Sequence, residues 1–239
     1  TARYSLDSLN PLIKVNADVR NIDLYALKFS ADTIRFKTQL NADLTRADAS
    51  HINGTINIPS LDLTYGHSNY MFDSISLIAG YSDSLQLLEL RAPFLDMDLN
   101  GNYEIEILPA VAQNLAIDYI TVYPPTGTIF KPAFAELKGE LRYHPVFTGF
   151  VPDIKAMKNI TFSGDINTEK RELLLRVDMP GLVYADCAVD SAHFAINTRN
   201  DTLRYSMELE KLTSPSVNLN KTLLSGKAKD GVIAWQLEL

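Results

Sequence analysis

The sequence predicts an all-β protein built as one long, strongly curved antiparallel sheet, a half-pipe, with one or two short helices. Apolar and polar residues alternate in run after run from Leu12 to Leu239, and turn residues interrupt the runs at short intervals. Side chains in a strand point to opposite faces in turn, so each run describes a strand with one apolar and one polar face. Parallel strands need long helical crossovers, for which the short connections leave little room.

The run from 34 to 44 shows the alternation most clearly. Ile34 and Phe36 fall on one side, whereas Arg35 and Lys37 fall on the other. The turns that separate such runs are expected at positions rich in Asn, Asp, Gly, Pro and Ser. These positions are Asn10-Pro11, 48–50, 66–69, 82–84, 100–102, 167–170, Pro180-Gly181, 197–201, 214–216 and Asp230-Gly231.

Two segments depart from the strand pattern. The segment around 108–121 begins with Pro109, which suits a first helical turn, and we place Val111, Leu115 and Ile120 on one helical face. Pro124-Pro125 is expected to end this helix. A second helix of one or two turns is expected over 152–158.

The organisation is expected to be continuous across the chain. A soft boundary near 123–127 separates a first segment, 1–123, from a second, 128–239, and composition does not change across it. The chain begins at Thr1 without a signal peptide, and it contains no apolar stretch of membrane-spanning length. We therefore expect it to be a fragment of a longer protein.

Five glycines occupy apolar-face positions inside expected strands: Gly54, Gly101, Gly139, Gly164 and Gly226. A glycine in a strand marks a bend, a bulge or a close approach. We favour sheet curvature, or an aromatic ring such as Phe134 or Trp235 packed over the gap. The alternative is a widened apolar interior with space for a ligand. The triplet 100–102 is also compatible with a plain turn.

Composition and motifs argue against several functions. The net charge of −7 disfavours nucleic acid and a flat anionic membrane surface as partners. His51, His67, His144 and His193 are too scattered for a metal site, and Cys187 lacks an adjacent acid or base. The expectation is therefore no catalytic residue, no metal and no cofactor.

Four carboxylates raise the hypothesis of a glycosidase site, because two opposed acids suffice for glycoside hydrolysis. Asp96 and Asp98, and likewise Glu104 and Glu106, alternate with apolar residues. We therefore assign them to the solvated face of strands rather than to an active site.

The alternation implies a long apolar surface that another sheet or a ligand must fill. One hypothesis is a hydrophobic groove in a protein that is not an enzyme, and a groove without polar groups would hold lipid tails without recognising headgroups. Taken singly, each lining residue is better explained as ordinary core. The expected lining is Ile34, Phe36, Leu40, Leu44, Ile56, Ile58, Leu137, Leu141, Phe162 and Ile166. The alternative is a closed β-sandwich that acts as a structural or interaction module of the cell envelope. A carbohydrate-binding domain is disfavoured because the single tryptophan, Trp235, falls on the apolar side.

Several segments carry a family resemblance. The stretch 144–155 (HPVFTGFVPDIK) leads into 160–164 (ITFSG), and 223–239 reads as a closing hairpin. Together with the segment from Leu108 to Pro124-Pro125, these resemble TamB-like proteins of the AsmA-like superfamily of Gram-negative bacteria. The similarity is diffuse over the chain and strongest from Ala133 to Leu239.

The resemblance implies a folded-over sheet with a hydrophobic trough, the β-taco. It implies a periplasmic location, with an inner-membrane anchor in the full-length protein. It also implies transport of phospholipid between the inner and outer membranes, and outer-membrane assembly with an Omp85-type partner. Membrane and partner contacts of such proteins lie in terminal regions absent from this sequence, so only the trough maps onto its residues.

Overall fold

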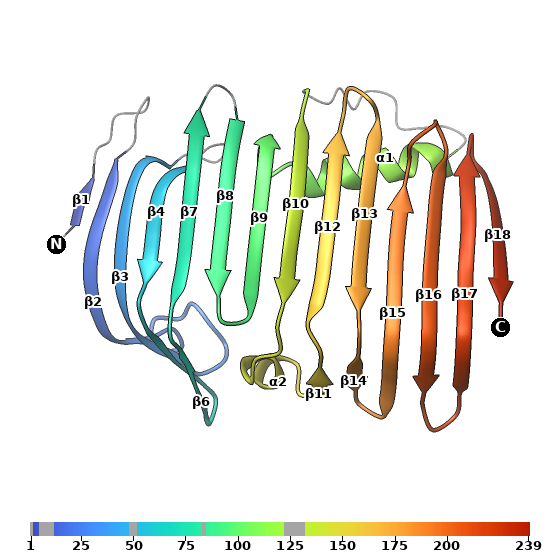
Figure 1. Ribbon diagram of the computed structural model, residues 1–239. Helices are drawn as coiled ribbons and strands as arrows, with labels where there is room; N and C mark the ends of the chain where they lie inside the picture. Colours follow the sequence, from blue (N-terminus) through green and yellow to red (C-terminus); the bar gives the residue numbers. More distant parts are fainter. Residues whose placement is uncertain (1, 5–11, 48–51, 83–84, 122–131) are drawn as a thin grey trace.

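The computed structural model describes residues 2–4, 12–47, 52–82, 85–121 and 132–239 (Figure 1). Eighteen strands and two helices lie in these residues. Before the first helix the strands are β1 (Ala2–Tyr4), β2 (Ile13–Asp23), β3 (Ile34–Ala47), β4 (Ile52–Ile58), β5 (Leu61–Tyr65), β6 (Ser68–Phe72), β7 (Ile75–Ser82), β8 (Leu85–Ala92) and β9 (Leu95–Asn102). After it they are β10 (Phe134–Leu141), β11 (Ile154–Met157), β12 (Ile160–Asn167), β13 (Glu172–Met179), β14 (Leu182–Tyr184), β15 (Cys187–Asn197), β16 (Leu203–Thr213), β17 (Asn218–Lys229) and β18 (Val232–Glu238). The helices are α1 (Leu108–Ile120) and α2 (Val146–Phe150).

The strands form one antiparallel meander in which chain neighbours lie side by side. Four long strands are interrupted by short breaks, so that β4 continues into β5, β6 into β7, β11 into β12 and β13 into β14. Pro59 and Pro180 lie at two of these breaks, because proline cannot donate a ladder hydrogen bond. The sheet is open, with β1 at one edge and β18 at the other.

β9 and β10 are paired along their whole length although α1 lies between them in the chain. The sheet therefore runs continuously from the first half of the sequence to the second. The boundary expected at 123–127, together with Pro124-Pro125, lies outside the described residues.

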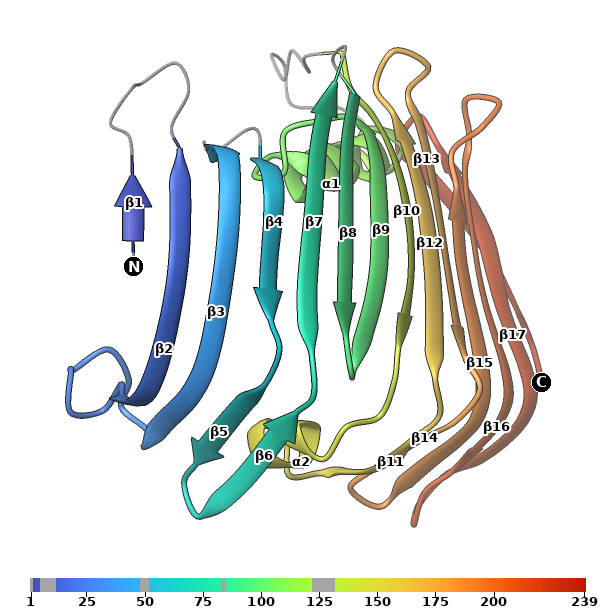
Figure 2. The ribbon, with the colours of Figure 1, turned by 60° about the vertical axis from the view of Figure 1, so that its left-hand side comes forward.

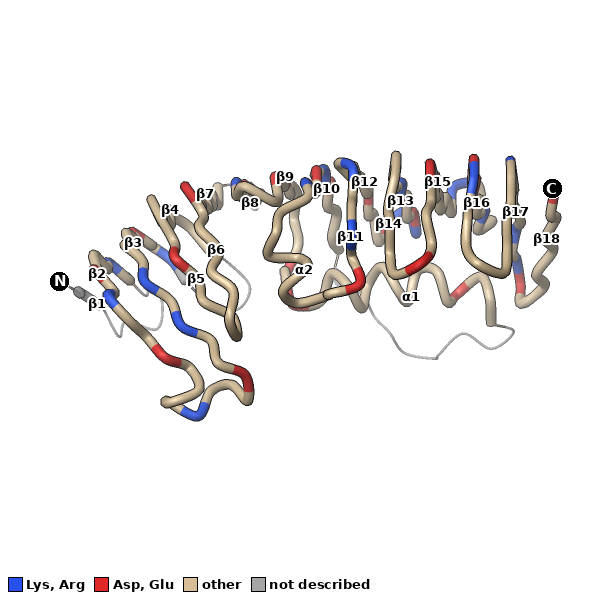
Figure 3. The backbone as a smooth tube through the Cα atoms, turned by 90° about the horizontal axis from the view of Figure 1, so that it is seen from below, with Lys and Arg blue, Asp and Glu red and all other residues tan. Residues whose placement is uncertain are grey.

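The sheet is a single curved layer. Figures 2 and 3 show the strands bowed around the side on which α1 and α2 lie. Register shifts in β2, β3 and β15 contribute to the bowing, because an extra residue in one strand bends it and increases its twist. The prediction of an all-β, strongly curved antiparallel sheet with one or two short helices is confirmed.

Two of the strand glycines are required by the backbone. Gly54 has φ +136° and Gly101 has φ +148°, and a Cβ at either position would overlap main-chain atoms of the adjacent strand. Gly101 lies inside β9, so the triplet 100–102 is not a turn. Both glycines mark close approach of neighbouring strands, as expected for a bend.

Aromatic rings cover two other glycines. A Cβ on Gly139 would overlap the ring of Phe162, and one on Gly226 would overlap the ring of Tyr205. The expectation of a ring over the gap is confirmed, but Phe162 and Tyr205 fill the role that was assigned to Phe134 and Trp235. These glycines accommodate the protein's own side chains and do not widen the interior.

Helix α1 begins and ends within one residue of the predicted limits. Its buried face consists of Val111, Leu115 and Tyr119, whereas Ile120 is 42% exposed. The assignment of Ile120 to that face was wrong, because successive positions on one side of a helix are three or four residues apart. The helix packs on β13, β15, β16 and β17 through Leu173, Ile196, Leu203 and Ala228.

The second helix was predicted in the wrong place. Residues 154–157 form β11, which pairs with β14, and the helix is α2, immediately after Pro145. Main-chain pairing with β14 outweighs the weak local preference of this short segment. Glu104 and Glu106 were likewise misassigned to a strand, because they lie in the irregular segment and turn between β9 and α1.

Leu115→Ala should lower the free energy of unfolding by about 2–5 kcal/mol, because Leu115 is 1% exposed and its removal leaves a cavity between α1 and the sheet. Urea unfolding followed by circular dichroism measures this. The matched control is Ile120→Ala on the exposed side of the same helix, which should change stability little. Equal losses in the two variants would contradict this packing of α1.

Candidate functional site

A row of apolar side chains crosses the sheet from β2 to β18 without a polar member. Each residue of the row lies opposite the next in strand register. The row is Val15, Ala42, Ile56, Leu77, Leu90, Met97, Gly139, Phe162, Val177, Phe194, Met207, Leu224 and Leu237. A second row runs beside it through Ile13, Leu44, Gly54, Ala79, Leu88, Leu99, Leu137, Gly164, Leu175, Ile196, Tyr205, Gly226 and Trp235. We call the surface formed by these two rows and their same-side neighbours the apolar face.

The ten side chains predicted to line a groove all belong to the apolar face. They come from two separate stretches, β3–β4 and β10–β12, which the apolar residues of β7, β8 and β9 connect. Leu44 is buried, and the other nine are half-buried. Ile166 packs against the α1 cluster and Leu137 against the cluster around Tyr103, so these two belong to the protein's own core.

The groove lining expected from the sequence did not include the last strands, although the alternation places residues of β18 on the apolar side. Met207 is 42% exposed, and on β18 Ile233, Trp235 and Leu237 are 50%, 68% and 48% exposed. Within the apolar face, large side chains are thus most open to solvent next to the β18 edge.

Helix α1 covers only part of the apolar face. It runs across the strands near one end of them, beneath the section from β10 to β17 (Figures 1 and 3). Its contacts reach Ile166, Leu173, Ile196 and Leu203. Phe162, Val177, Phe194 and Met207 lie farther along the strands, and none of them is fully buried.

An aromatic cluster holds the strand ends opposite α1. The ring of His144 stacks on Phe72 with centroids 4.7 Å apart, and Phe94 packs edge-on against both Phe72 and Phe147. His144 Nδ1 accepts a hydrogen bond from the N–H of Val146, which lies in α2. Burial lowers the pKa of His144, because a charged imidazole loses hydration in this cluster.

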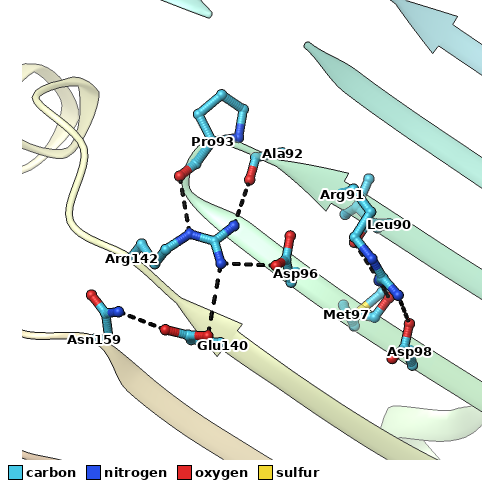
Figure 4. A network of polar contacts seen from close by, with 10 residues as sticks. All are labelled: Leu90, Arg91, Ala92, Pro93, Asp96, Met97, Asp98, Glu140, Arg142 and Asn159. Carbon is cyan, nitrogen blue, oxygen red and sulfur yellow. Dashed lines mark hydrogen bonds and ion pairs between the residues drawn. The ribbon is translucent and has the colours of Figure 1, made fainter. Parts of the chain in front are cut away.

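The opposite face of the sheet is polar and carries ion pairs. The Arg142 guanidinium donates hydrogen bonds to the main-chain oxygens of Ala92 and Pro93 and to Asp96, at 3.0, 3.3 and 2.8 Å (Figure 4). The hydrogen bond from Arg142 lowers the pKa of Asp96. Arg142 therefore fastens the β8–β9 turn to β10, which is a structural role.

Asp98 belongs to a second ion-pair group. Arg91 lies 2.5 Å from Asp98 and 3.7 Å from Glu89, and its guanidinium also donates to the carbonyl oxygen of Met97 (Figure 4). The assignment of Asp96 and Asp98 to the polar face is confirmed.

One group on the polar face has the order of a catalytic triad. Ser191 Oγ lies 3.3 Å from His193 Nε2, and His193 Nδ1 lies 2.6 Å from Asp178. The side chains of His193 and Asp178 are 48% and 39% exposed. An activated serine needs a site that excludes water and stabilises an oxyanion. We interpret this exposed group as a cross-strand polar ladder.

The described residues contain no group of three or more His, Cys, Asp or Glu side chains arranged to hold a metal ion. Neither helix in the described part of the chain has the length and hydrophobicity that a membrane crossing requires. Cys187 is half-buried at the start of β15 and has a free thiol.

Fold and surface together define the class to which this chain belongs: an open, single-layer, curved antiparallel sheet with a continuous, partly covered apolar face. Comparison with models of protein families, with curated proteins and with solved structures finds no match. The resemblance to TamB-like proteins therefore stays a prediction.

Lowering the pH from about 8 to about 5 should destabilise the protein through His144. Because folding lowers the pKa of His144 below its usual 6.5, the contribution of this residue is complete above that value and is lost as the pH falls through the folded pKa. His144→Phe keeps the stacking on Phe72 and should reduce the pH dependence. The urea concentration at the midpoint of unfolding, measured at both pH values, gives the pH dependence.

The control for this measurement is Phe94→Leu, a change in the same aromatic cluster that alters no titratable group and should retain the pH dependence of the parent protein. An unchanged pH dependence in His144→Phe would show that other groups cause it.

Proposed function

We propose that this chain is a non-enzymatic lipid-binding segment whose apolar face carries acyl chains. The observation that supports the proposal is the pair of unbroken apolar rows, which α1 covers only in part. Exposed apolar surface of this extent is costly in water, and large exposed patches generally mark a binding surface. Acyl chains on this face would supply the second layer that a single sheet lacks.

The dimensions of the face suit several acyl chains. At the usual spacing between strands, the row from Val15 to Leu237 is roughly 55–60 Å long. A strand of six to eight residues spans roughly 20–27 Å, comparable to one extended acyl chain. Burying about 16 methylene groups contributes up to about 13 kcal/mol before ordering costs.

The chemistry of the face suits transport rather than selective binding. The rows contain no charged side chain, and their polar groups are the phenol of Tyr205 and the indole N–H of Trp235. Selective small-molecule sites place several convergent polar groups beside apolar walls. A face without them holds tails regardless of headgroup, as movement of phospholipid along the sheet requires.

We further propose that the segment works in the periplasm and moves phospholipid between inner and outer membranes. This step depends on the resemblance to TamB-like proteins, as does a link to outer-membrane assembly with an Omp85-type partner.

The second candidate function is an interaction module that binds another protein. All described strands belong to one sheet, so a closed two-sheet sandwich was the wrong architecture. The exposed β18 edge nevertheless favours strand addition by another protein. Such a module would bind a partner but take up no lipid.

Met207→Asp should weaken binding of a fluorescent fatty acid, cis-parinaric acid, by about tenfold or more, because it places a charge among the acyl chains. Met207 is 42% exposed, so the substitution should leave the fold intact. The matched control is Ser206→Asp, the preceding residue of β16 on the polar face, which should bind like the parent protein.

Fluorescence titration gives the affinities, and thermal unfolding checks both variants. The proposal fails if the parent protein takes up no fatty acid, or if both variants bind as it does.

A further inference from the structure

A hollow of about 510 Å³ opens over β15–β18. Most of its lining residues lie on the polar side of these strands, among them Ala195, Ser206 and Ser225, with the longer side chains of Asn197 and Gln236. The rest of the lining, Tyr205, Gly226 and Trp235, comes from the second row of the apolar face.

Two cations on neighbouring strands belong to the lining of this hollow. Arg204 on β16 lies directly opposite Lys227 on β17, and Ser206 lies directly opposite Ser225 one step along the same strands. Side chains directly opposite on neighbouring strands are close, and like charges in that arrangement are destabilising. The Arg204 guanidinium donates a hydrogen bond to the carbonyl oxygen of Arg199, at 3.1 Å, which holds it beside the turn after β15.

Some charges on this face are compensated by neighbours, whereas the directly opposed Glu136 and Asp165 have no cation partner among the described residues. Lys14 lies opposite Asp43, with its ammonium 2.6 Å from the carboxylate. Glu89 and Asp98 also lie opposite each other, and Arg91 is placed between them. Among the described residues no carboxylate makes an ion pair with Arg204 or Lys227.

Two carboxylates near the hollow along the chain have other hydrogen-bond partners. Asp201 binds Lys229 at 3.0 Å, and Glu238 accepts a hydrogen bond from the side-chain amide of Gln236 at 2.9 Å. Glu208, two residues beyond Ser206 in β16, is exposed and makes no ion pair with either cation. Arg204 and Lys227 are therefore like-charged register neighbours without a carboxylate partner in the described part of the chain.

We propose that this hollow is a binding site for a phosphate-type oxyanion, with Arg204 and Lys227 as charged ligands and the Ser206 and Ser225 hydroxyls as neutral donors. An anion between the two cations relieves their repulsion and accepts charge-assisted hydrogen bonds from both. A phosphate with its attached group fits the volume. This inference does not depend on the proposed lipid function, since it concerns the other face of the sheet.

The experiment titrates isotope-labelled protein with inorganic pyrophosphate at constant ionic strength and follows backbone amide shifts by NMR. Shifts are expected in 195–197, 204–206, 225–227 and 234–236. The double variant Arg204→Gln/Lys227→Gln should bind about tenfold more weakly. The matched control is Lys138→Gln, an exposed cation of the same face that lies opposite Asp98, and its affinity should equal that of the parent.

A second arm identifies the source of the anion. Sedimentation with phosphatidylcholine vesicles, with and without phosphatidylglycerol, tests a lipid headgroup. Variant-sensitive binding of pyrophosphate supports a free phosphate compound, and variant-sensitive binding to the anionic vesicles alone supports a headgroup. Shifts spread evenly over surface cations, or equal affinities in the double variant and the parent, would overturn the proposal.

Folding provides an independent readout. Arg204→Gln alone should raise the urea midpoint slightly, because it removes the repulsion from Lys227, and pyrophosphate should stabilise the parent more than the double variant. If Arg204→Gln lowers the midpoint and pyrophosphate stabilises both proteins equally, the two cations are not an uncompensated pair and the site is excluded.

Discussion

The structure depends on one constraint: a single amphipathic sheet has an apolar side that must be kept from water. Most domains satisfy it with a second layer over the whole surface. Here the second layer is α1, which packs through Val111, Leu115 and Tyr119 near one end of the strands. The aromatic cluster around Phe72 and α2 protects part of the other end. The middle of the apolar face, and above all β18, keeps half-buried or exposed large side chains.

Curvature follows from the same constraint. Bowing the sheet brings its apolar side chains toward one another and toward α1, and so reduces their contact with water (Figure 2). The backbone allows this bending at bulges and at Gly54 and Gly101, where neighbouring strands approach too closely for a Cβ. Phe162 and Tyr205 fill the gaps over Gly139 and Gly226. The polar face stays solvated and is held by cross-strand ion pairs.

The strand alternation made most of the fold predictable. All ten side chains expected in a groove lie on the apolar face, and the limits of α1 were close. The predictions were wrong where contacts between distant segments determine the secondary structure. Residues 154–157 became β11 because β14 lies beside them, although their local pattern is compatible with a helix. Trp235 was correctly placed on the apolar side, but the exposure of Met207 and Trp235 was not predicted, because alternation alone does not specify which strand forms the edge of the sheet. The hollow around Arg204 and Lys227 had no sequence signal, because those residues are 23 positions apart and meet only through the β16–β17 register.

The sequence by itself determined which side of each strand is apolar, because a period of two residues is a local property of the chain. Tertiary structure alone decided that the strands form one open layer, that β9 joins β10 across α1, and that α1 covers only one end of the apolar face. Those outcomes depend on the total free energy of pairing and burial over distant segments. A hydrophobic pattern predicts that a face must be shielded from water, but it does not specify which element or ligand packs against it.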